Sequence, residues 1–379
     1  MAHKHIDLEK VKSDRDKTSG RIKELYEELA KTKHNKRTEH HIGLIGAKIA
    51  KLKEKIERRA KGKKEGEGYV IKRTGDATVA LVGFPSVGKS SLLNKITNAN
   101  SPVASYDFTT LRLIPGLINY NSAQIQLFDL PGILEGASEG RGRGREVFSC
   151  LRNVDLIIIV IDAKKPEQYD VIKNELYESN IRLNEKKPAI TLMKKDRGGI
   201  SVRAHNKLKH ISAEEIRYVL NEFKILNADV ILKEDVTVER FIDFVESNKA
   251  YIPSIIVVNK IDIASESEIK NISEKLKPDI FVSAEKSINL ENLKKTIFNK
   301  LELIRIYLKP LNQKSDMEKP LIMHKDSTIK DVCLKLHKDF AEKLKFARVW
   351  GKSAKFEGQT FLSLEHVLED GDIIEFHLK

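Results

Sequence analysis

The sequence predicts an α/β fold built around a phosphate-binding loop, with further domains on both sides of it and one inserted into it. Three observations lead to this prediction. Residues 83–90 read GFPSVGKS, a GxxxxGKS pattern between an apolar strand and a helix-forming run. Residues 126–132, 254–262 and 279–285 each begin as a strand-like apolar run and end in polar or small residues. The chain has 379 residues, which is enough for two or three domains.

The composition is that of a basic chain with a heavily charged surface. The net charge is +13 and the pI is about 9.3, which favours nucleic acid, the ribosome or an anionic membrane surface as partners. Cys150 and Cys333 match no metal or redox spacing, which fits a reducing compartment. The longest apolar run, 156–161, has six residues, and the charged start is unlike a signal peptide. We therefore expect a cytoplasmic protein without a membrane partner.

The first part of the chain predicts a helical hairpin over residues 1–65. Residues 6–60 contain no proline, and two groups of apolar residues follow helical spacing. These groups are Ile22, Leu25, Tyr26 and Leu29, and then Ile45, Ile49, Leu52 and Ile56. Lysines and arginines crowd the exit of the second helix, between residues 48 and 64. They suit either contact with RNA phosphates or a solvated helix face, and the sequence leaves both open.

The GxxxxGKS loop is predicted to hold the phosphates of a nucleotide. Gly83 and Gly88 allow the backbone to turn sharply and to aim its N–H groups at phosphate oxygens. Lys89 should reach the β- and γ-phosphates, and Ser90 should bind Mg²⁺. The loop residues predicted to contact the nucleotide are Gly83, Phe84, Pro85, Ser86, Val87, Gly88, Lys89, Ser90 and Ser91.

Two segments downstream are predicted to sense the γ-phosphate. The first contains Phe108, Thr109 and Thr110, of which Thr110 is the expected Mg²⁺ ligand. The second is a DxxG motif, in which Asp129 should hold Mg²⁺ and the N–H of Gly132 should face the γ-phosphate. The predicted metal ligands are thus Ser90, Thr110 and Asp129, and the predicted catalytic residues are Lys89, Thr110 and Gly132.

The NKxD motif at residues 259–262 predicts that the base is guanine. Asp262 can accept hydrogen bonds from the guanine N1–H and exocyclic amine, whereas adenine would leave this carboxylate unpaired. Asn259 can bond the base edge and tie back to the loop, and the Lys260 stem can cover the ring. Ser283 and Ala284 end a further strand, and their N–H groups are expected to bind the guanine carbonyl.

Together these motifs resemble the developmentally regulated GTP-binding protein family, in the Obg-like branch of the translation-factor GTPases. The matching segments are residues 83–91, 108–111, 129–137, 140–145, 182–187, 198–200 and 346–351, so the likeness spans nearly the whole chain. The resemblance implies a Mg²⁺-dependent switch that hydrolyses GTP to GDP and phosphate on ribosomes or in translation. It also implies RNA or ribosome contact and a dedicated partner protein in eukaryotic members.

One position departs from many GTPases. Ile133 stands directly after the DxxG glycine, where a glutamine often orients the attacking water. An isoleucine cannot orient water, so we expect slow intrinsic turnover unless another group supplies this role. K⁺ near the phosphates is one candidate, although Ser86 replaces the asparagine of several K⁺-using relatives. A partner residue is the other, and Arg141, Arg143 and Arg145 suit phosphate contact or a solvated loop equally well.

An inserted subdomain is predicted over residues 166–250, which divides the GTPase domain into residues 66–165 and 251–303. The strands at 156–162 and 254–259 should be sheet neighbours, yet the sequence between them far exceeds the ~30 residues of a βαβ unit. Strands are expected at 188–195 and 228–232, and a helix at 212–225. The resemblance implies a fold like a domain of ribosomal protein S5, for which RNA binding and bracing of the GTPase domain both stay open.

Residues 304–379 predict a small β-grasp domain. Strand-like runs at 321–323 and 372–378 flank an amphipathic helix over 328–344, with Ile329, Val332, Leu336 and Phe340 on one face. This domain resembles the TGS domain of the same family, which supports RNA or ribosome contact by analogy.

Three functions are compatible with the motifs to different degrees. The first is the GTPase switch. The second is a scaffold that binds GTP and RNA but hydrolyses slowly or not at all, as Ile133 would allow. The third is an ATPase or nucleotide kinase that shares only the phosphate-binding loop, against which the NKxD motif argues.

Overall fold

The computed structural model describes residues 20–28, 31, 43, 45–52, 75–97, 106–107, 112–130, 144–311, 316–337 and 339–378. The chain divides into two compact units. Unit 1 comprises Met1–Glu67 and Glu185–Tyr251, and unit 2 comprises Gly68–Asn184 and Ile252–Lys379. The chain crosses between them near β6 (Ile181–Leu183) and β10 (Ala250–Ile252). Residues 166–184, predicted as the start of the insertion, lie in unit 2.

A seven-stranded sheet forms the centre of unit 2, in the order β12-β11-β5-β1-β4-β3-β2. Its strands are β1 (Ala77–Val82), β2 (Tyr106–Asp107), β3 (Arg112–Tyr120), β4 (Ala123–Asp129), β5 (Leu156–Asp162), β11 (Ser254–Asn259) and β12 (Ile280–Phe281). The strands from β12 to β4 run parallel, and β3 is antiparallel to β4. The predicted pairing of 156–162 with 254–259 is confirmed, because β5 and β11 are direct neighbours.

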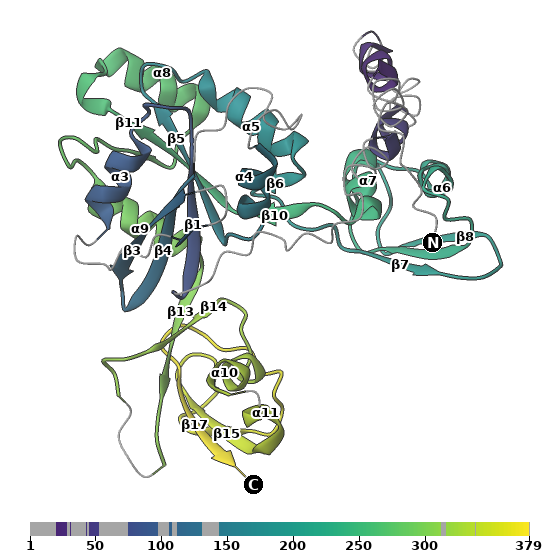
Figure 1. The fold of residues 1–379 in the computed structure, drawn as a ribbon. Coiled ribbons are helices and arrows are strands. Elements are labelled where there is room, and N and C mark those ends of the chain that lie inside the picture. The colour runs from purple at the N-terminus through teal and green to yellow at the C-terminus, as the bar shows by residue number, and fades with distance from the viewer. Residues whose placement is uncertain are drawn as a thin grey trace, which may run out of the picture. The chain divides into compact units, whose positions relative to one another are not determined.

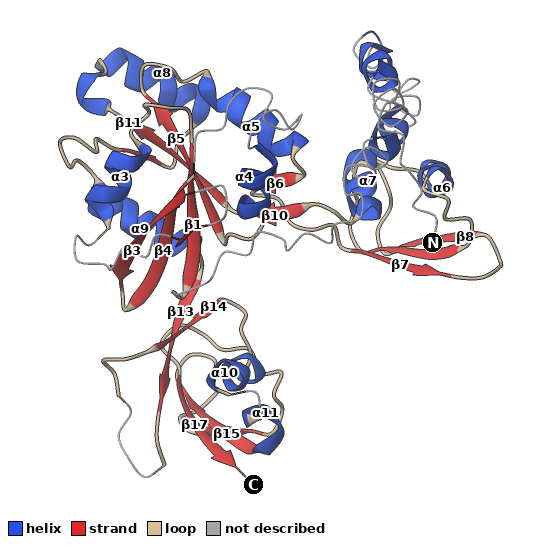
Figure 2. Cartoon of the chain, viewed as in Figure 1, coloured by secondary structure: helices blue, strands red, loops and turns tan. Residues whose placement is uncertain are grey.

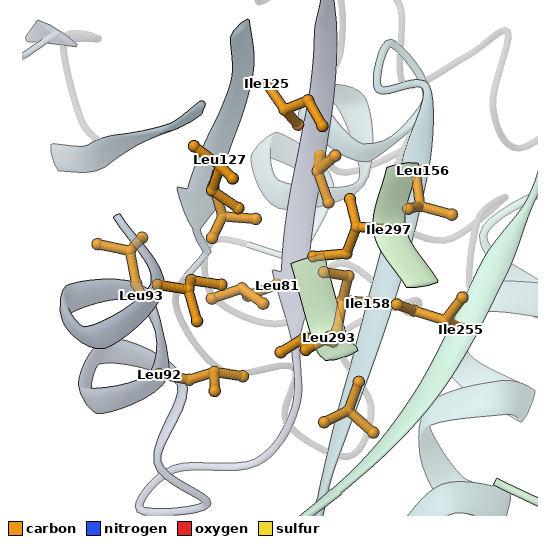
Figure 3. Packing of buried hydrophobic residues seen from close by; sticks show 14 of the residues in the cluster. Leu81, Leu92, Leu93, Ile125, Leu127, Leu156, Ile158, Ile255, Leu293 and Ile297 are labelled. Carbon is orange, nitrogen blue, oxygen red and sulfur yellow. The ribbon is translucent and has the colours of Figure 1, made fainter. Parts of the chain in front are cut away.

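Helices lie on both sides of this sheet (Figure 1). They are α3 (Lys89–Ile96), α4 (Gly144–Leu151), α5 (Gln168–Glu178), α8 (Glu266–Leu276) and α9 (Leu290–Lys300), with a 3-10 turn at Ile261–Ile263. β1 and β5 are buried along their whole length, which explains their continuous apolar sequences. Figure 3 shows Leu81 of β1 in one core cluster with Leu93 of α3 and Leu293 of α9. This core fixes the strand ends on which the site is built.

Unit 1 contains a three-stranded sheet and helices on one of its faces (Figure 2). The strands β7 (Ile190–Lys194), β9 (Ala228–Leu232) and β8 (Ile200–Ala204) lie in that order, with α6 (Ala213–Glu222) and α7 (Val238–Glu246) packed against them. The predicted strands at 188–195 and 228–232 and helix at 212–225 are confirmed in place, whereas β8 and α7 were not predicted. Residues 20–28 and 45–52 are helical as expected, and the hairpin's turn lies outside the described residues.

The C-terminal part of unit 2 is a five-stranded sheet in the order β14-β13-β17-β15-β16. It consists of β13 (Leu303–Leu308), β14 (Leu321–His324), β15 (Leu344–Trp350), β16 (Gln359–Phe361) and β17 (Ile373–Leu378), with α10 (Ile329–Leu336) and α11 (Phe340–Lys343). The hairpins β13–β14 and β15–β16 are joined through β17, which is parallel to β13 and antiparallel to β15, and this forms the predicted β-grasp.

The single helix predicted over 328–344 is wrong. α10 ends at Leu336, His337 is extended with φ −162° and ψ 144°, and α11 follows as a separate turn. Val332 and Cys333 are fully buried, but Leu336 is 37% exposed, so no burial holds another turn in place. Phe340 instead packs edge-on against Phe376 of β17, with ring centroids 5.5 Å apart. Across the described parts of the chain, no helix is long and apolar enough to cross a membrane.

Candidate functional site

The phosphate-binding loop lies at the carboxyl end of β1, between the ends of its neighbours in the sheet. Gly83 has no room for a side chain, because an added Cβ would come within 2.5 Å of the Val160 carbonyl oxygen. Gly88 adopts φ 95°, and a Cβ there would run into the side-chain amide of Asn259. The two glycines therefore let the loop approach β5 and β11 closely before it enters α3.

Lys89, the first residue of α3, folds back over this loop. Its side chain is buried, and its Nζ donates hydrogen bonds to the carbonyl oxygens of Gly83 and Phe84, both at 3.0 Å. Burial lowers the pKa of Lys89 from its usual value, and the nearby carboxylate of Asp129 opposes that shift. An ammonium group carries three donors, so one is left for an anion that enters the loop.

Asp129 and Ser90 form the part of the site that suits a divalent cation. The Ser90 hydroxyl donates to Asp129 Oδ2 at 2.5 Å. Asp129 Oδ1 is buried and accepts no hydrogen bond within the described structure. A buried, unpartnered carboxylate oxygen is costly by itself, so its position beside a hydroxyl fits Mg²⁺, which prefers oxygen ligands.

Asn259 connects the loop to the far side of the site. It is only 1% exposed, and it ends β11. Its Nδ2 donates to the Val87 carbonyl oxygen at 2.9 Å, and its Oδ1 accepts from the Ala284 N–H at 3.0 Å. Because both bonds are buried, this one amide fixes the loop relative to the turn after β12.

Asp262 and Lys260 stand beside Asn259 in the NKxD segment. Lys260 adopts a left-handed backbone with φ 65°, and its Nζ lies 2.7 Å from Asp162 Oδ2. Asp262 is exposed, and its Oδ1 accepts from the hydroxyl of buried Ser283 at 2.5 Å. The Lys286 N–H donates to that same hydroxyl at 3.1 Å, which fixes its proton toward Asp262.

The N–H groups of Ser283 and Ala284, which were predicted to bind the guanine carbonyl, are hydrogen bonded within the protein. The Ser283 N–H donates to the Ile288 carbonyl oxygen at 3.3 Å, and the Ala284 N–H donates to Asn259. Both N–H groups therefore hold the turn after β12 and the Asn259 side chain in place. Their contact with a base carbonyl stays a prediction that requires these donors to be shared.

Several predicted residues lie outside the described part of the chain. These are Phe108, Thr109, Thr110 and Gly132, together with Ile133, Arg141 and Arg143. The described residues Gly83 to Ser91, Asp129, Asn259, Lys260, Asp262, Ser283 and Ala284 all occur at one edge of the seven-stranded sheet. The structure thus brings together the loop, one cation ligand pair and the NKxD segment.

Asp162 is a site residue that the sequence analysis missed. It ends β5 directly opposite Asn259, and besides the Lys260 ammonium it accepts from the Lys164 N–H at 2.9 Å. Lys164 in turn holds Glu268 at 2.7 Å. Hydrogen bonds from Lys164 and then from Ser265 lower the pKa of Glu268 to about 2. The available signal was an acidic residue at the end of a buried strand.

Comparisons with known proteins match most of the chain. Residues 78–195 match a family described as a 50S ribosome-binding GTPase, 197–303 the C-terminal region of that domain, and 304–378 the TGS domain. Developmentally-regulated GTP-binding protein 1 of Xenopus laevis is 42% identical over 362 residues, covering 94% of this chain and 98% of that protein. The chain belongs to the developmentally regulated GTP-binding protein family.

A further relative agrees with this assignment, and one solved structure is similar in part. An uncharacterized GTP-binding protein of Methanocaldococcus jannaschii is 51% identical over 362 residues, covering 94% of this chain and 92% of the relative. The Schizosaccharomyces pombe YchF GTPase is a structural neighbour with a TM-score of 0.47 and 17% identity, covering 80% and 98% of the two chains. As a developmentally regulated GTP-binding protein, the chain is a GTP-binding GTPase with a C-terminal TGS domain. Membership of this GTP-binding family argues against the ATPase and nucleotide-kinase alternatives.

Proposed function

We propose that this GTPase hydrolyses GTP with Mg²⁺ and uses the GTP–GDP cycle as a switch on the ribosome. The observation that supports the nucleotide site most strongly is the double hydrogen bond of buried Asn259, which joins the phosphate loop to the base pocket. A site with its base half and phosphate half already joined suits one ligand that spans both, namely a guanine nucleotide.

Within this proposal each residue type has a physical role. The loop from Gly83 to Ser91 surrounds the phosphates with backbone N–H groups, and Lys89 turns its third donor toward the β- and γ-phosphates. Asp262, held by Ser283, accepts the two donors on the guanine edge. Lys260, held by Asp162, covers the ring with its stem. Ala284 positions Asn259 and shares its N–H with the base carbonyl.

Ser90 and Asp129 would hold Mg²⁺, with Thr110 as the ligand from the switch segment. When bound, Mg²⁺ neutralises charge on the phosphate oxygens and so favours transfer to water. Thr110, with Thr109 and Phe108 beside it, and the N–H of Gly132 are proposed to contact the γ-phosphate and to release it after hydrolysis. This order–release step is what would make the protein a switch.

The water-orienting group is the open part of the mechanism. Ile133 offers no hydrogen bond to water, so we propose slow intrinsic turnover that K⁺ or a partner residue accelerates. The alternative is a scaffold that senses GTP and scarcely hydrolyses it. Ile133 supports that alternative as well, and measurements of GTP turnover distinguish the switch from the scaffold.

Two observations support the ribosome as the partner: the family that the chain matches and the positive net charge. The match of residues 78–195 is to a family described as ribosome-binding, and the net charge is +13. We assign residues 66–184 and 252–303 to the GTPase domain, because α5 lies with the seven-stranded sheet in unit 2, and 1–65, 185–251 and 304–379 to accessory domains that contact RNA, ribosome or a partner protein. The chain is proposed to act in the cytoplasm, where ribosomes are found.

The test is GTP turnover in KCl and in NaCl of equal ionic strength, with and without purified ribosomes. We expect stimulation by ribosomes, loss of turnover in Lys89→Ala, and faster turnover in KCl. Equal rates in the two salts would remove the K⁺ step. If ribosomes bind in a GTP-dependent way but turnover stays negligible under every condition, the scaffold replaces the switch.

A further inference from the structure

One β-hairpin joins the two segments that are proposed to sense the γ-phosphate. β3 begins two residues after Thr110, and β4 ends three residues before Gly132. The two strands are antiparallel and pair through seven residues each. Both proposed γ-phosphate contacts are therefore attached to the same end of this hairpin.

The hairpin is a stiff unit. Its turn consists of Asn121 and Ser122, whose φ angles of 48° and 65° are those of a two-residue turn that matches the twist of the strands. Cross-strand pairing then continues without a shift in register from this turn to Asp129. Over about 20 Å of strand, a displacement at the γ-phosphate end is carried to the turn end.

Asp76, directly before β1, holds the turn end of the hairpin. Its N–H donates to the Gln124 carbonyl oxygen at 2.7 Å, and its Oδ2 accepts from the Gln124 N–H at 2.9 Å. The preceding Gly75 lies so close that a Cβ there would come within 2.4 Å of that same carbonyl oxygen. The position of Asp76 therefore depends on the position of Gln124 at the start of β4.

The other carboxylate oxygen of Asp76 faces the TGS domain. Asp76 Oδ1 lies 3.5 Å from the Nζ of Lys335, in the last turn of α10. The same ammonium donates to the Ile322 carbonyl oxygen of β14 at 2.5 Å. Gln124, Asp76, Lys335 and Ile322 thus form one continuous path from the hairpin to the β-grasp sheet.

Apolar packing holds the TGS domain to the GTPase core beside this path. Leu303 of β13 and Ile322 of β14 belong to the same buried cluster as Ile297 of α9. At the end of β3, the Tyr120 ring lies 5.6 Å from the Phe298 ring of α9, measured between centroids. These apolar contacts do not depend on charge, so they keep the domains together whether or not the ion pair is formed.

The Asp76–Lys335 pair is the part of this contact that can respond to the hairpin. The Asp76 side chain is 23% exposed and the Lys335 side chain 38%. An ion pair with this exposure changes an equilibrium by up to about fivefold. The pair is therefore weak enough to form in one state of the hairpin and to break in the other.

We propose that the β3–β4 hairpin transmits the nucleotide state to the TGS domain, with the Asp76–Lys335 pair as the contact that forms when GTP is bound. This inference rests on the proposed switch, in which Thr110 and Gly132 are held by the γ-phosphate. With both held, the hairpin has one position, and Gln124 fixes Asp76 beside Lys335. After hydrolysis the hairpin is released at its γ-phosphate end, Asp76 is no longer fixed, and the TGS domain loses this contact.

Coupling of this kind acts in both directions. If GTP favours the Asp76–Lys335 pair by some factor, the pair favours GTP over GDP by the same factor. A partner that pulls the TGS domain away from Asp76 would thereby lower the preference of the site for GTP. The pair is thus a route by which the TGS domain regulates the nucleotide site.

The test is hydrogen–deuterium exchange of the full-length chain with the non-hydrolysable analogue GMPPNP or with GDP, both with Mg²⁺. We expect the amides of residues 321–336, which span β14 and α10, to exchange about two- to fivefold faster with GDP. Lys335→Gln should abolish this difference. Because the coupling is reciprocal, this variant should also lower the preference for GMPPNP over GDP by the same factor.

Two further variants show whether the ion pair is responsible. Asp76→Asn keeps an acceptor for the Gln124 N–H but removes the charge, so it should act like Lys335→Gln, and the double variant should add nothing. The matched control is Lys330→Gln, which removes an α10 lysine whose ion pair with Glu365 lies within the TGS domain. The control should leave the exchange difference and the nucleotide preference unchanged. Nucleotide binding reports that each variant is folded.

The exchange pattern distinguishes a failure of this inference from a failure of the switch. Nucleotide-dependent exchange in residues 112–129 with nucleotide-independent exchange in 321–336 would overturn the inference and leave the switch intact. No nucleotide dependence in either segment would overturn both. An equal loss in Lys330→Gln, or an unchanged nucleotide preference in Lys335→Gln, would refute the ion pair as the coupling contact. Because GMPPNP is not hydrolysed, slow GTP turnover does not affect these results.

Discussion

Replacing Asp262 by asparagine tests the proposed base pocket directly. The Asp262 carboxylate accepts a hydrogen bond from the Ser283 hydroxyl at 2.5 Å. Asparagine has nearly the same shape, and its side-chain oxygen can accept the same hydrogen bond. Guanine presents two donors to this group, N1–H and the exocyclic amine. Asparagine can accept one of them, and its own amide N–H then opposes the second.

The expected loss follows from these hydrogen bonds. A hydrogen bond to a charged group contributes about 1.5–3 kcal/mol, and an opposed donor adds about 1 kcal/mol or more. A loss of roughly 2.5–4 kcal/mol corresponds to a GTP affinity about 60- to 1000-fold weaker. Xanthine has a carbonyl where guanine has the amine, so it should accept from the new amide. Asp262→Asn should therefore prefer XTP to GTP.

The assay is competition of GTP, XTP and ATP against a fluorescent guanine nucleotide, at matched Mg²⁺. Glu274→Gln on α8 is the control, because it makes the same carboxylate-to-amide change at an exposed position. Wild-type GTP affinity in Asp262→Asn would refute the pocket. A loss of GTP affinity without any gain for XTP, in a variant that melts like the wild type, would refute the proposed base orientation.

Three further predictions concern other residues of the site. Lys89→Met should abolish measurable GTP binding yet raise the melting temperature of the protein without nucleotide, because burial disfavours the charged amine and so lowers its pKa; a lower melting temperature without nucleotide would contradict this. Asp162→Asn should weaken GTP binding about tenfold by releasing the Lys260 ammonium, and Asp162→Glu should restore part of it; equal affinity in all three proteins would show that the pair does not position Lys260. The Glu268 carboxyl has a pKa of about 2 when folded against an ordinary 4.5, so its contribution to stability is present above pH 4.5 and is lost as the pH falls toward 2. Glu268→Gln should show less acid destabilisation over that window in pH-dependent melting, and an unchanged acid profile would count against this.

The sequence predicted those parts of the fold whose signal is local. β1, β5 and β11 are continuous apolar runs because both faces of a central parallel strand are buried, and the motifs follow their carboxyl ends. Asp162 was missed because its role depends on register. The neighbouring strands were predicted, but their register, which places Asp162 opposite Asn259 and within reach of Lys260, was not.

The joining of residues 1–67 with 185–251 in unit 1 was also not predictable from local pattern. Ala47 and Ala50 share a core cluster with Val238 and Ile242 of α7. The contact depends on small residues, since a Cβ on Gly43 would lie 3.0 Å from Val238. Helical periodicity scores large apolar side chains, so a helix face that buries alanine and glycine against a distant segment carries little signal.

The buried amide of Asn259 has a consequence for the energetics of the proposed switch. It hydrogen bonds to Val87 and Ala284, so the protein itself joins the base and phosphate halves of the site. Contacts to the base, ribose and first phosphates are then the same for GTP and GDP, and they cannot bias one state over the other. The free energy that drives switching must come from groups that contact only the γ-phosphate. In the proposed mechanism these are Thr110, Gly132 and the third donor of Lys89, so substitutions at Asp262 should weaken GTP and GDP by the same factor, whereas Thr110→Ala should weaken GTP alone.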